Sequence, residues 1–351
     1  MSRPLSASAA WPIALSMGDP AGIGPEIVVK ALRERPALQR HVVVAGDIQT
    51  LHRALRLTGP REGSAEDALV LAEIDDVSAM ARLPPGCMAV VQACAPLQPP
   101  VFGRIDAQAG RAAADCIRWA AQAALSGRAR AVVTAPIQKE ALAAAGIDHP
   151  GHTEFLQSLA AAHAGAPVQA LPVRMMLSCP GLSAVLVSIH VSLRQALQAV
   201  TLERVLQTIR ITDAHFRRAG LAAPRIAVAG LNPHAGEGGL FGREEIDVIA
   251  PAIAQARSEG VEASGPYAPD TVFMRARQGA FDVVVAMYHD QGLIPVKLLG
   301  LEHGVNTTLG LPFVRTSPDH GTAFDIAGTG RASAASLLAA IDAAFEAQST
   351  S

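Results

Sequence analysis

Three histidines follow apolar runs that have the composition of buried β-strands. His190 ends the run in "LSAVLVSIHVS", His234 follows the run in "PRIAVAGLNPHAGEGG", and His289 follows the run in "FDVVVAMYHDQGLIPVK". A single histidine in such a place is most often a polar residue whose ring bonds a neighbouring carbonyl. Three imidazoles that meet at one point have another use, because they bind a divalent metal and leave coordination positions open. No local pair such as HExxH supports a metal, so both interpretations stay open.

Other polar segments carry side chains suited to binding. "GIDHPGHTEFL" places His152, Thr153 and Glu154 ahead of an apolar run, which suits a substrate contact or simply a helix N-cap at Thr153. Arg315 can grip a phosphate or carboxylate through two hydrogen bonds, whereas Lys297 offers a mobile charge or an acid/base group. Either cation can equally pair with a nearby acid. "GEGGLFGREE" is a glycine-rich segment that either brings backbone amides to an anion or only turns the chain.

The C-terminal region is the densest in polar side chains, and its glycines and prolines favour special backbone geometry. Its polar residues are Asn306, Thr307, Arg315, Thr316, Ser317, Asp319, His320 and Asp325. The chain has no GxGxxG fingerprint, because "GDPAGIGPE" has its glycines at the wrong spacing. The pattern alone therefore predicts no Rossmann dinucleotide site.

The scaffold that must bring these residues together is predicted to be α/β. Seven apolar runs read as strands, and alanine-rich helical candidates lie between several of them; the runs are "PIALSM", "HVVVAGD", "MAVVQA", "RAVVTAP", "AVLVSIH", "RIAVAGLNP" and "DVVVAMYH". Strands without polar alternation, separated by helices, indicate parallel strands covered on both faces. Ligands of such sheets bind beyond the carboxyl ends of the strands, where all three histidines are expected. "GPEIVVKALRERP" predicts a helix between Pro25 and Pro36, and Pro251 predicts a kink or break in a later helix.

Composition limits the class of partner. With 351 residues the chain is expected to divide into two domains. Half of the residues are apolar and the net charge is −2, which excludes disorder and an electrostatic claim on nucleic acid and favours a small-molecule partner. The four cysteines form no CxxC pair and are expected to be reduced, mostly buried thiols. The N-terminus is expected to be a short tail before a strand at 13–17, and no apolar run suits a membrane helix, so we expect a cytoplasmic protein.

Several longer blocks resemble the signatures of the 4-hydroxythreonine-4-phosphate dehydrogenase family of pyridoxal 5'-phosphate biosynthesis. The blocks run in family order from residue 16 to about residue 330, and they are "SMGDPAGIGPEI", "GHTEFL", "GLNPHAGEGG", "GPYAPDTVF", "YHDQGLIPVK" and "GVNTTLGLPFVRTSPDHGTAFDIAGTG". The resemblance implies a two-domain α/β/α subunit of the isocitrate/isopropylmalate dehydrogenase-like type, with its active site in the cleft between domains. Residues 1–138 plus 300–351 would form the cofactor-binding domain, and 139–299 the metal, substrate and dimerisation domain.

The resemblance also implies roles for individual residues in a homodimer whose active site is shared between subunits. One divalent cation per subunit, zinc, cobalt or magnesium, would be held by His190, His234 and His289. The substrate contacts carry over to a set made up of His152, Thr153, Lys297, Asn306 and Arg315. Asp270 matches an acid close to the metal and is a catalytic candidate together with Lys297. NAD or NADP would contact Gly321 and Asp325, and a carboxylate at Asp325 favours NAD, because it would repel a 2'-phosphate.

The implied reaction is oxidation of 4-phosphohydroxy-L-threonine at C3 to 2-amino-3-oxo-4-(phosphooxy)butanoate, which decarboxylates to 3-amino-2-oxopropyl phosphate. The nearest alternative is a paralogous dehydrogenase that acts on 4-phospho-D-threonate, D-erythronate 4-phosphate or a carboxylated ring diol. Two alternatives come from other classes. Three imidazoles also suit the zinc-bound hydroxide of a hydrolase, and a silent binding protein would show no turnover.

Overall fold

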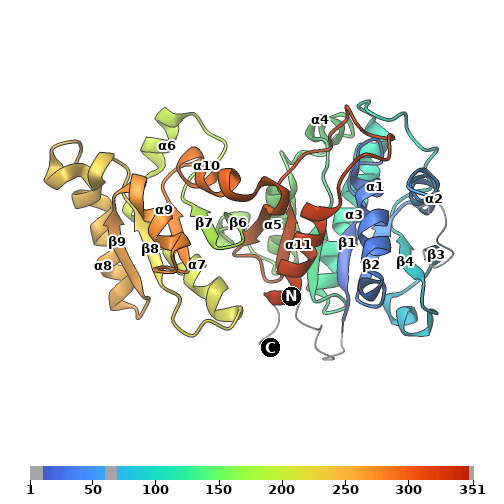
Figure 1. The fold of residues 1–351 in the computed structure, drawn as a ribbon, viewed down its shortest axis with the longest axis horizontal. Coiled ribbons are helices and arrows are strands. Elements are labelled where there is room, and N and C mark those ends of the chain that lie inside the picture. The colour runs from blue at the N-terminus through green and yellow to red at the C-terminus, as the bar shows by residue number, and fades with distance from the viewer. Residues whose placement is uncertain (1–10, 60–68, 348–351) are drawn as a thin grey trace. The chain divides into compact units, whose positions relative to one another are not determined.

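The computed structural model describes residues 11–59 and 69–347, which form two compact units (Figure 1). The first unit comprises the described residues as far as His149 together with Thr322–Ala332. The second comprises Pro150–Gly321 and the described residues from Ser333 onward. Strands and helices alternate along both units, so the predicted α/β class is confirmed. The expected N-terminal tail lies mostly outside the described residues.

The first unit is a parallel sheet with the strand order β3-β4-β2-β1-β5. Its strands are β1 (Ile13–Ser16), β2 (Val42–Gly46), β3 (Val70–Glu73), β4 (Cys87–Gln92) and β5 (Ala131–Thr134). Its helices are α1 (Gly24–Glu34), α2 (Ile48–Leu57), α3 (Ala107–Leu125) and α4 (Lys139–Ala144). The central strands β1, β2 and β5 are buried along their whole length, as their unbroken apolar runs predict.

The second unit has the strand order β12-β11-β6-β7-β10-β8-β9. Its strands are β6 (Arg174–Cys179), β7 (Leu182–Leu186), β8 (Ile226–Ala229), β9 (Ala263–Tyr267), β10 (Val283–Ala286), β11 (Val305–Leu309) and β12 (Val314–Pro318). Its helices are α5 (His152–His163), α6 (Leu193–Ala199), α7 (Leu202–Arg218), α8 (Ala250–Ser258), α9 (Pro269–Arg277), α10 (His289–Gly300) and α11 (Ala335–Glu346).

The expectation of parallel strands is correct for only part of this sheet. Strands β7, β10, β8 and β9 are parallel neighbours, but β6 pairs antiparallel with β7, and β11 pairs antiparallel with both β6 and β12. A two-residue gap joins β6 to β7, and four residues join β11 to β12. Connections this short make hairpins, whereas a parallel pair needs a long crossover.

Two cores on opposite faces of the second sheet explain its apolar runs. Val283 and Val285 of β10 pack in one cluster with residues of α7 and α8. Val284 and Ala286 pack in the other with residues of α9 and α10. Because successive side chains of a strand point to opposite faces, both faces of β10 must be apolar.

The seven predicted strands correspond to β1, β2, β4, β5, β7, β8 and β10. The five strands that were not predicted are more polar or lie at edges: β3, β6, β9, β11 and β12. In the C-terminal polar region, for which no strand was predicted, "VNTTL" and "VRTSP" are strands. Threonine and valine are both β-branched, and that preference outweighs their polarity.

The helix predictions hold with one refinement. α1 begins at Gly24 with Pro25 in its first turn and ends at Glu34, before Pro36. The predicted interruption near Pro251 is a turn of π-helix at Glu245–Ile249, after which Pro251 occupies the first turn of α8. Proline has no backbone N–H, and it is tolerated in the first turn of an α-helix because that turn does not require one. Among the described residues, no helix is long and apolar enough to cross a membrane.

The boundaries of the two units differ from those expected at 138/139 and 299/300. They lie at 149/150, at 321/322 and at 332/333. Strands β11 and β12 hydrogen-bond into the sheet of the second unit, and Thr316 Oγ1 of β12 donates to the carbonyl of Ala340 in α11 at 2.7 Å. Residues 300–321 and α11 therefore pack with the second unit, and only Thr322–Ala332 returns to the first.

Candidate functional site

The three histidines lie beyond the carboxyl ends of three neighbouring parallel strands, as expected. His190 follows β7, His234 follows β8, and His289 begins α10 just after β10. Strand β10 lies between β7 and β8 and pairs in parallel with both. The carboxyl ends of parallel neighbours lie at one edge of the sheet, so the topology gathers these residues from far apart in the sequence.

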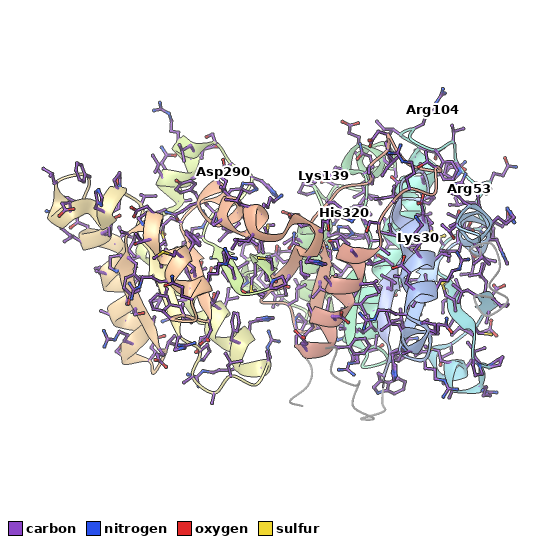
Figure 2. The ribbon with its side chains drawn as sticks, viewed as in Figure 1. Lys30, Arg53, Arg104, Lys139, Asp290 and His320 are labelled. Carbon is purple, nitrogen blue, oxygen red and sulfur yellow. The ribbon has the colours of Figure 1, made fainter. Side chains whose placement is uncertain are left out.

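His190 and His289 form a close pair. Their ring centroids lie 5.7 Å apart with the planes tilted by 46°. His190 has a φ of 51°, a left-handed conformation that residues other than glycine seldom adopt. His289 Nδ1 lies 2.6 Å from Asp290 Oδ1, and Asp290 stands at the start of α10 (Figure 2). A carboxylate on one ring nitrogen fixes the ring and leaves Nε2 for another partner.

The residues after His289 explain why the strand ends so abruptly. Gln291 accepts a hydrogen bond from the N–H of Met287 at 2.6 Å and donates to the carbonyl of Gly230 at 2.7 Å. It therefore ties the end of β10 to the end of β8. Gly292 faces β7 so closely that a Cβ would lie 2.5 Å from Leu186 Cδ2. The start of α10, which carries His289, therefore packs directly against the carboxyl ends of β7, β8 and β10.

His234 lies in a turn with an unusual backbone conformation. It begins an unusual run of left-handed residues at 234–238, with a φ of 52° at His234 itself. Its ring is exposed and lies 6.3 Å, between centroids, from the ring of Phe241. Within residues 11–59 and 69–347, no three histidine, cysteine or acidic side chains lie together in a way that would hold a metal ion. One described chain therefore brings together two of the three predicted ligands.

A buried carboxylate supports the turn that carries His234. Glu245 is 2 % exposed, and its Oε1 accepts hydrogen bonds of 2.7 Å from the N–H groups of Leu231 and of Asn232. Its Oε2 accepts a third, of 3.0 Å, from Asn232 Nδ2. Burial alone would raise the pKa of Glu245, but these hydrogen bonds outweigh it and the pKa is lowered. The backbone N–H groups of Leu231 and Asn232 therefore bind the carboxylate of Glu245.

Replacing Glu245 by glutamine should destabilise the protein by roughly 1–3 kcal/mol at pH 7, because the new amide NH2 group faces the donor of Asn232. The folded-state pKa of Glu245 is lowered, so its carboxylate contributes stability above the usual glutamate range, and this contribution is lost as pH falls through the folded pKa. Urea unfolding of both proteins from pH 7 down to pH 3 measures this. A difference that does not shrink below about pH 4.3 would contradict the assignment.

Predicted substrate residues share one face of the β11–β12 hairpin. Asn306 lies opposite Ser317, which puts Thr308 opposite Arg315, and Arg315 Nη1 donates to Thr308 Oγ1 at 3.1 Å. Arg315 is 2 % exposed; burial lowers its pKa to about 10, and the charge of nearby Glu154 opposes that shift. At that pKa Arg315 stays protonated at neutral pH. It is a desolvated cation, which strengthens its attraction for an anion.

Asn306 offers a further polar group on this face. Its Oδ1 is buried, and no hydrogen-bond partner for it is present in the described part of the chain. The oxygen and nitrogen of such an amide can exchange places by a flip, so the group can accept or donate. A buried amide end with no protein partner is suited to a polar ligand.

Lys297 lies on the helix that begins at His289. It stands in the last turns of α10, and its Nζ forms an ion pair of 2.9 Å with Asp319 Oδ2. The alternative that Lys297 pairs with an acid is therefore confirmed. Asp319 directly follows β12, so this pair lies at the end of the hairpin that carries Asn306.

The segment with His152 and Thr153 opens α5, as predicted. The N-cap is Gly151, with no side-chain capping bond, so the interpretation of Thr153 as an N-cap is wrong. Thr153 lines a cavity of about 510 Å³ together with Ser188 and Val191. A second cavity of about 260 Å³ includes Ser188, Val191 and both paired histidines in its lining. The loop after β7 thus joins Thr153 to the histidine pair.

The other predicted residues lie on exposed turns. Asp270 is in the first turn of α9, directly after β9, and α9 contacts the turn that carries His234. Gly321 ends the second unit, and Asp325 lies in the segment Thr322–Ala332 of the first unit. Both are exposed. Their predicted contact with a nucleotide stays a prediction.

Asp19, in "GDPAGIG", is a buried acid that was not predicted from the sequence. Asp19 is 1 % exposed, and its Oδ1 accepts a hydrogen bond of 2.8 Å from the N–H of Ala21. Burial raises the pKa of Asp19 to about 6, although the backbone N–H groups of Ala21 and Gln138 act in the other direction. An acid in a turn of apolar residues was the available signal.

Asp19→Asn should make the protein more stable at pH 7 by roughly 2–3 kcal/mol. The raised folded-state pKa means that the folded chain binds more protons than the unfolded chain between the usual aspartate value and about 6. Stability of the wild type therefore falls as pH rises through this window, and asparagine removes the loss. Urea midpoints from pH 4 to pH 7 test this, and a gain of equal size at every pH would rule it out.

Two α/β units with polar residues beyond the carboxyl ends of the strands are typical of the class of α/β proteins that bind small molecules. A 4-hydroxythreonine-4-phosphate dehydrogenase from Beijerinckia indica is 50% identical over 94% of this chain and 93% of that protein. A D-threonate 4-phosphate dehydrogenase from Salmonella typhimurium is 47% identical over 95% of this chain and 98% of that protein. The crystal structure of a 4-hydroxythreonine-4-phosphate dehydrogenase from Klebsiella pneumoniae superposes with a TM-score of 0.83, at 46% identity, and covers 97% of this chain and 100% of that one.

These relatives are all named as dehydrogenases, which supports an oxidoreductase. The family described as pyridoxal phosphate biosynthetic protein PdxA matches residues 37–344. The chain belongs to this family. The resemblance seen in its sequence blocks is confirmed.

Proposed function

We propose that the protein is a dehydrogenase, dependent on NAD or NADP and on a divalent metal, that oxidises 4-phosphohydroxy-L-threonine at C3. The product, 2-amino-3-oxo-4-(phosphooxy)butanoate, then decarboxylates to 3-amino-2-oxopropyl phosphate in the synthesis of pyridoxal 5'-phosphate. The observation that carries the proposal is the pair of imidazoles, 5.7 Å apart, beyond the carboxyl ends of adjacent strands and beside the cavity lined by Thr153.

The residues present fit a metal. His190 and His289 lie close together, Asp290 orients the His289 ring, and His190 is held in a left-handed conformation. His190, His234 and His289 would hold the cation, and imidazole ligands suit zinc or cobalt better than magnesium. The chemistry that a bound cation supplies is polarisation of the substrate's C3 hydroxyl.

A homodimer would complete this ligand set. His234 is not with the other two in the described chain, and the surfaces around both places expose apolar side chains. Near His234 in sequence these are Leu240 and Phe241. Val191 and Leu193 line one cavity with the histidine pair, and α6 and α10 expose Leu197, Ile294 and Leu298. Apolar patches of this kind are typical of protein interfaces. We propose that His234 of each subunit joins His190 and His289 of the partner in a cytoplasmic dimer.

The substrate's phosphate would be bound by Arg315 with help from Asn306 and Thr153. Arg315 is a buried cation whose guanidinium can form two parallel hydrogen bonds with a phosphate. Lys297, as the ammonium that Asp319 holds in place, would donate a hydrogen bond to the C3 oxygen as the carbonyl develops. His152 and Asp270 are proposed to orient the substrate's C2 and C3 substituents.

The chemistry that NAD or NADP supplies is acceptance of the hydride from C3. The exposed carboxylate of Asp325 would accept hydrogen bonds from ribose hydroxyls, with Gly321 nearby in sequence, and would favour NAD. Decarboxylation needs no further group, because the C3 ketone is β to the carboxylate and accepts the electron pair of the broken C–C bond.

A second candidate substrate is 4-phospho-D-threonate, or D-erythronate 4-phosphate, because the D-threonate 4-phosphate dehydrogenase of Salmonella typhimurium is 47% identical. These acids carry a hydroxyl at C2 where phosphohydroxythreonine carries an amine. Steady-state reduction of NAD with each purified substrate, in the presence of zinc, cobalt or magnesium, decides between them. A higher kcat/KM for phosphothreonate would overturn the assignment.

A further inference from the structure

The segment Thr322–Ala332 belongs to the first unit although it comes from the far end of the chain. It contains no helix or strand, and the hydrogen bonds from Ile326 N–H to the carbonyl of Ala323 and from Thr329 N–H to the carbonyl of Ile326 close short turns. A segment with so little structure of its own takes its shape from what holds it. Its neighbours on the first unit therefore decide where the exposed Asp325 lies.

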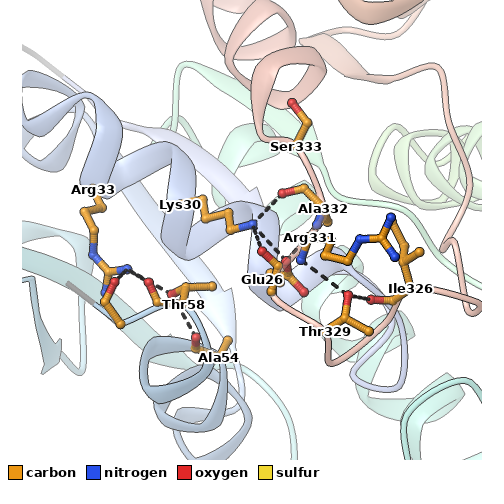
Figure 3. Close-up of polar contacts among 12 residues, drawn as sticks. Glu26, Lys30, Arg33, Ala54, Thr58, Ile326, Thr329, Arg331, Ala332 and Ser333 are labelled. Atoms are coloured by element: carbon orange, nitrogen blue, oxygen red, sulfur yellow. Dashed lines mark hydrogen bonds and ion pairs between the residues drawn. The ribbon is translucent and has the colours of Figure 1, made fainter. Parts of the chain in front are cut away.

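Lys30 of α1 holds the end of this segment (Figure 3). Its Nζ donates to the carbonyls of Gly330 at 2.7 Å and Ala332 at 2.6 Å, and to Glu26 Oε1 at 2.9 Å. An ammonium group has three N–H donors, so all of them are used. Glu26 Oε1 also accepts the N–H of Ala332 at 2.9 Å. Lysine and glutamate, one helical turn apart, thus bind both sides of the same peptide segment.

The beginning and middle of the segment are held by close packing. The N–H of Ile23, just before α1, donates to the carbonyl of Thr322 at 3.0 Å. A Cβ on Gly22 would lie 2.9 Å from Thr322 Cβ, and a Cβ on Gly103 would lie 2.7 Å from the carbonyl oxygen of Phe324. Lys30 and Glu26 together are therefore the charged anchors of this segment, and they secure the end nearest the boundary at 332/333.

Burial gives this anchor its strength. Glu26 is 2 % exposed and the Lys30 side chain 18 % exposed, so the pair is largely removed from water. Truncating either partner would leave the other charge buried without its counter-ion. Burying the pair costs desolvation. Glu26 and Lys30 belong to the first unit, whereas the histidine pair belongs to the second.

We propose that Lys30, aligned by Glu26, is a positioning residue for the dinucleotide: it fixes the segment that presents Asp325 and so sets the affinity for NAD. The inference rests on the proposed function. It gives Lys30 a role distinct from substrate binding. The proposed substrate residues belong to the other unit, and they are Arg315, Asn306 and Lys297.

The test compares Lys30→Met and Glu26→Gln with Arg56→Met, a control that removes an exposed cation from α2 of the same unit. Hydrogen exchange is followed in the full-length protein without nucleotide, and NAD affinity is measured by calorimetric titration. In both Lys30→Met and Glu26→Gln the amides of residues 329–332 should exchange at least about tenfold faster than in the wild type. Both substitutions should raise the Kd for NAD about tenfold, which equals about 1.4 kcal/mol of binding free energy. The control should do neither. KM for NAD should rise while kcat and KM for the phosphorylated substrate stay near wild type.

The outcomes separate the two proposals. If the wild type does not bind NAD or NADP, the proposed function fails, whatever the exchange shows. If the wild type binds NAD and both Lys30→Met and Glu26→Gln bind it equally well, the role of Lys30 is overturned. If Lys30→Met does not fold, Lys30→Arg replaces it, because a planar guanidinium keeps the charge but cannot direct three donors as the ammonium does. Unchanged exchange and affinity in that variant would overturn the proposal too.

Discussion

His234→Ala and His289→Ala should each reduce turnover by at least about a thousandfold and release the bound metal, with the fold intact. Both side chains lie at the surface or half-exposed beyond the strand ends, so their removal leaves no core cavity. Metal content by mass spectrometry, circular dichroism and NAD reduction provide the three readouts. A variant that keeps its metal and its turnover would remove that histidine from the ligand set.

Mixing the two inactive variants gives a sharper result. If His234 of one subunit completes the site of the other, a mixed dimer of His234→Ala and His289→Ala subunits contains one site with all three histidines. Random reassociation gives half mixed dimers with one working site of two, so about a quarter of wild-type activity should return. Subunits would be denatured, mixed and refolded together, or co-expressed with two tags.

The matched control is a mixture of His190→Ala and His289→Ala. These two residues lie in one pair within one chain, so every site in their mixed dimers lacks one of them. No activity should return. Recovery in this mixture, or none in the first one, would contradict the proposal that the site is shared.

Arg315→Ala should raise KM for the phosphorylated substrate by about a hundredfold while KM for NAD changes little, because a buried charge-assisted pair is lost. Arg315→Lys should recover only part of the affinity, since an ammonium cannot form two parallel hydrogen bonds. Because the side chain is 2 % exposed, thermal unfolding must be measured beside the kinetics.

The dephosphorylated substrate isolates the phosphate contact. With 4-hydroxy-L-threonine the wild type should already be slow, and Arg315→Ala should add little further loss. A loss as large with this compound as with the phosphorylated one would place Arg315 outside the phosphate site. Equal increases in KM for NAD and for substrate would do the same.

Much of this arrangement could be predicted from the sequence, because strand ends are local features. The apolar runs before His190, His234 and His289 identified β7, β8 and β10, and parallel pairing then placed the three histidines at one edge. The polar strands β11 and β12 could not be identified in this way. Their role depends on cross-strand partners such as Thr308 and Arg315, which only the hairpin register brings together.

Other features depend on contacts between segments far apart in the chain. Neither Glu245 nor Lys30 stands in a recognisable pattern, since each acts on a turn that other residues build. The boundaries between units were displaced for the same reason. A short segment that crosses back to the first unit looks, in sequence, like the rest of the C-terminal region.

The left-handed backbone at His190 and His234 has a consequence for anyone who wishes to move this arrangement into another protein. Imidazoles copied onto ordinary turns would point elsewhere, because the ring direction follows from torsion angles that most side chains avoid. For His234, the whole loop would have to be transferred together with its buried acid, Glu245. A histidine transferred alone would be an ordinary surface residue.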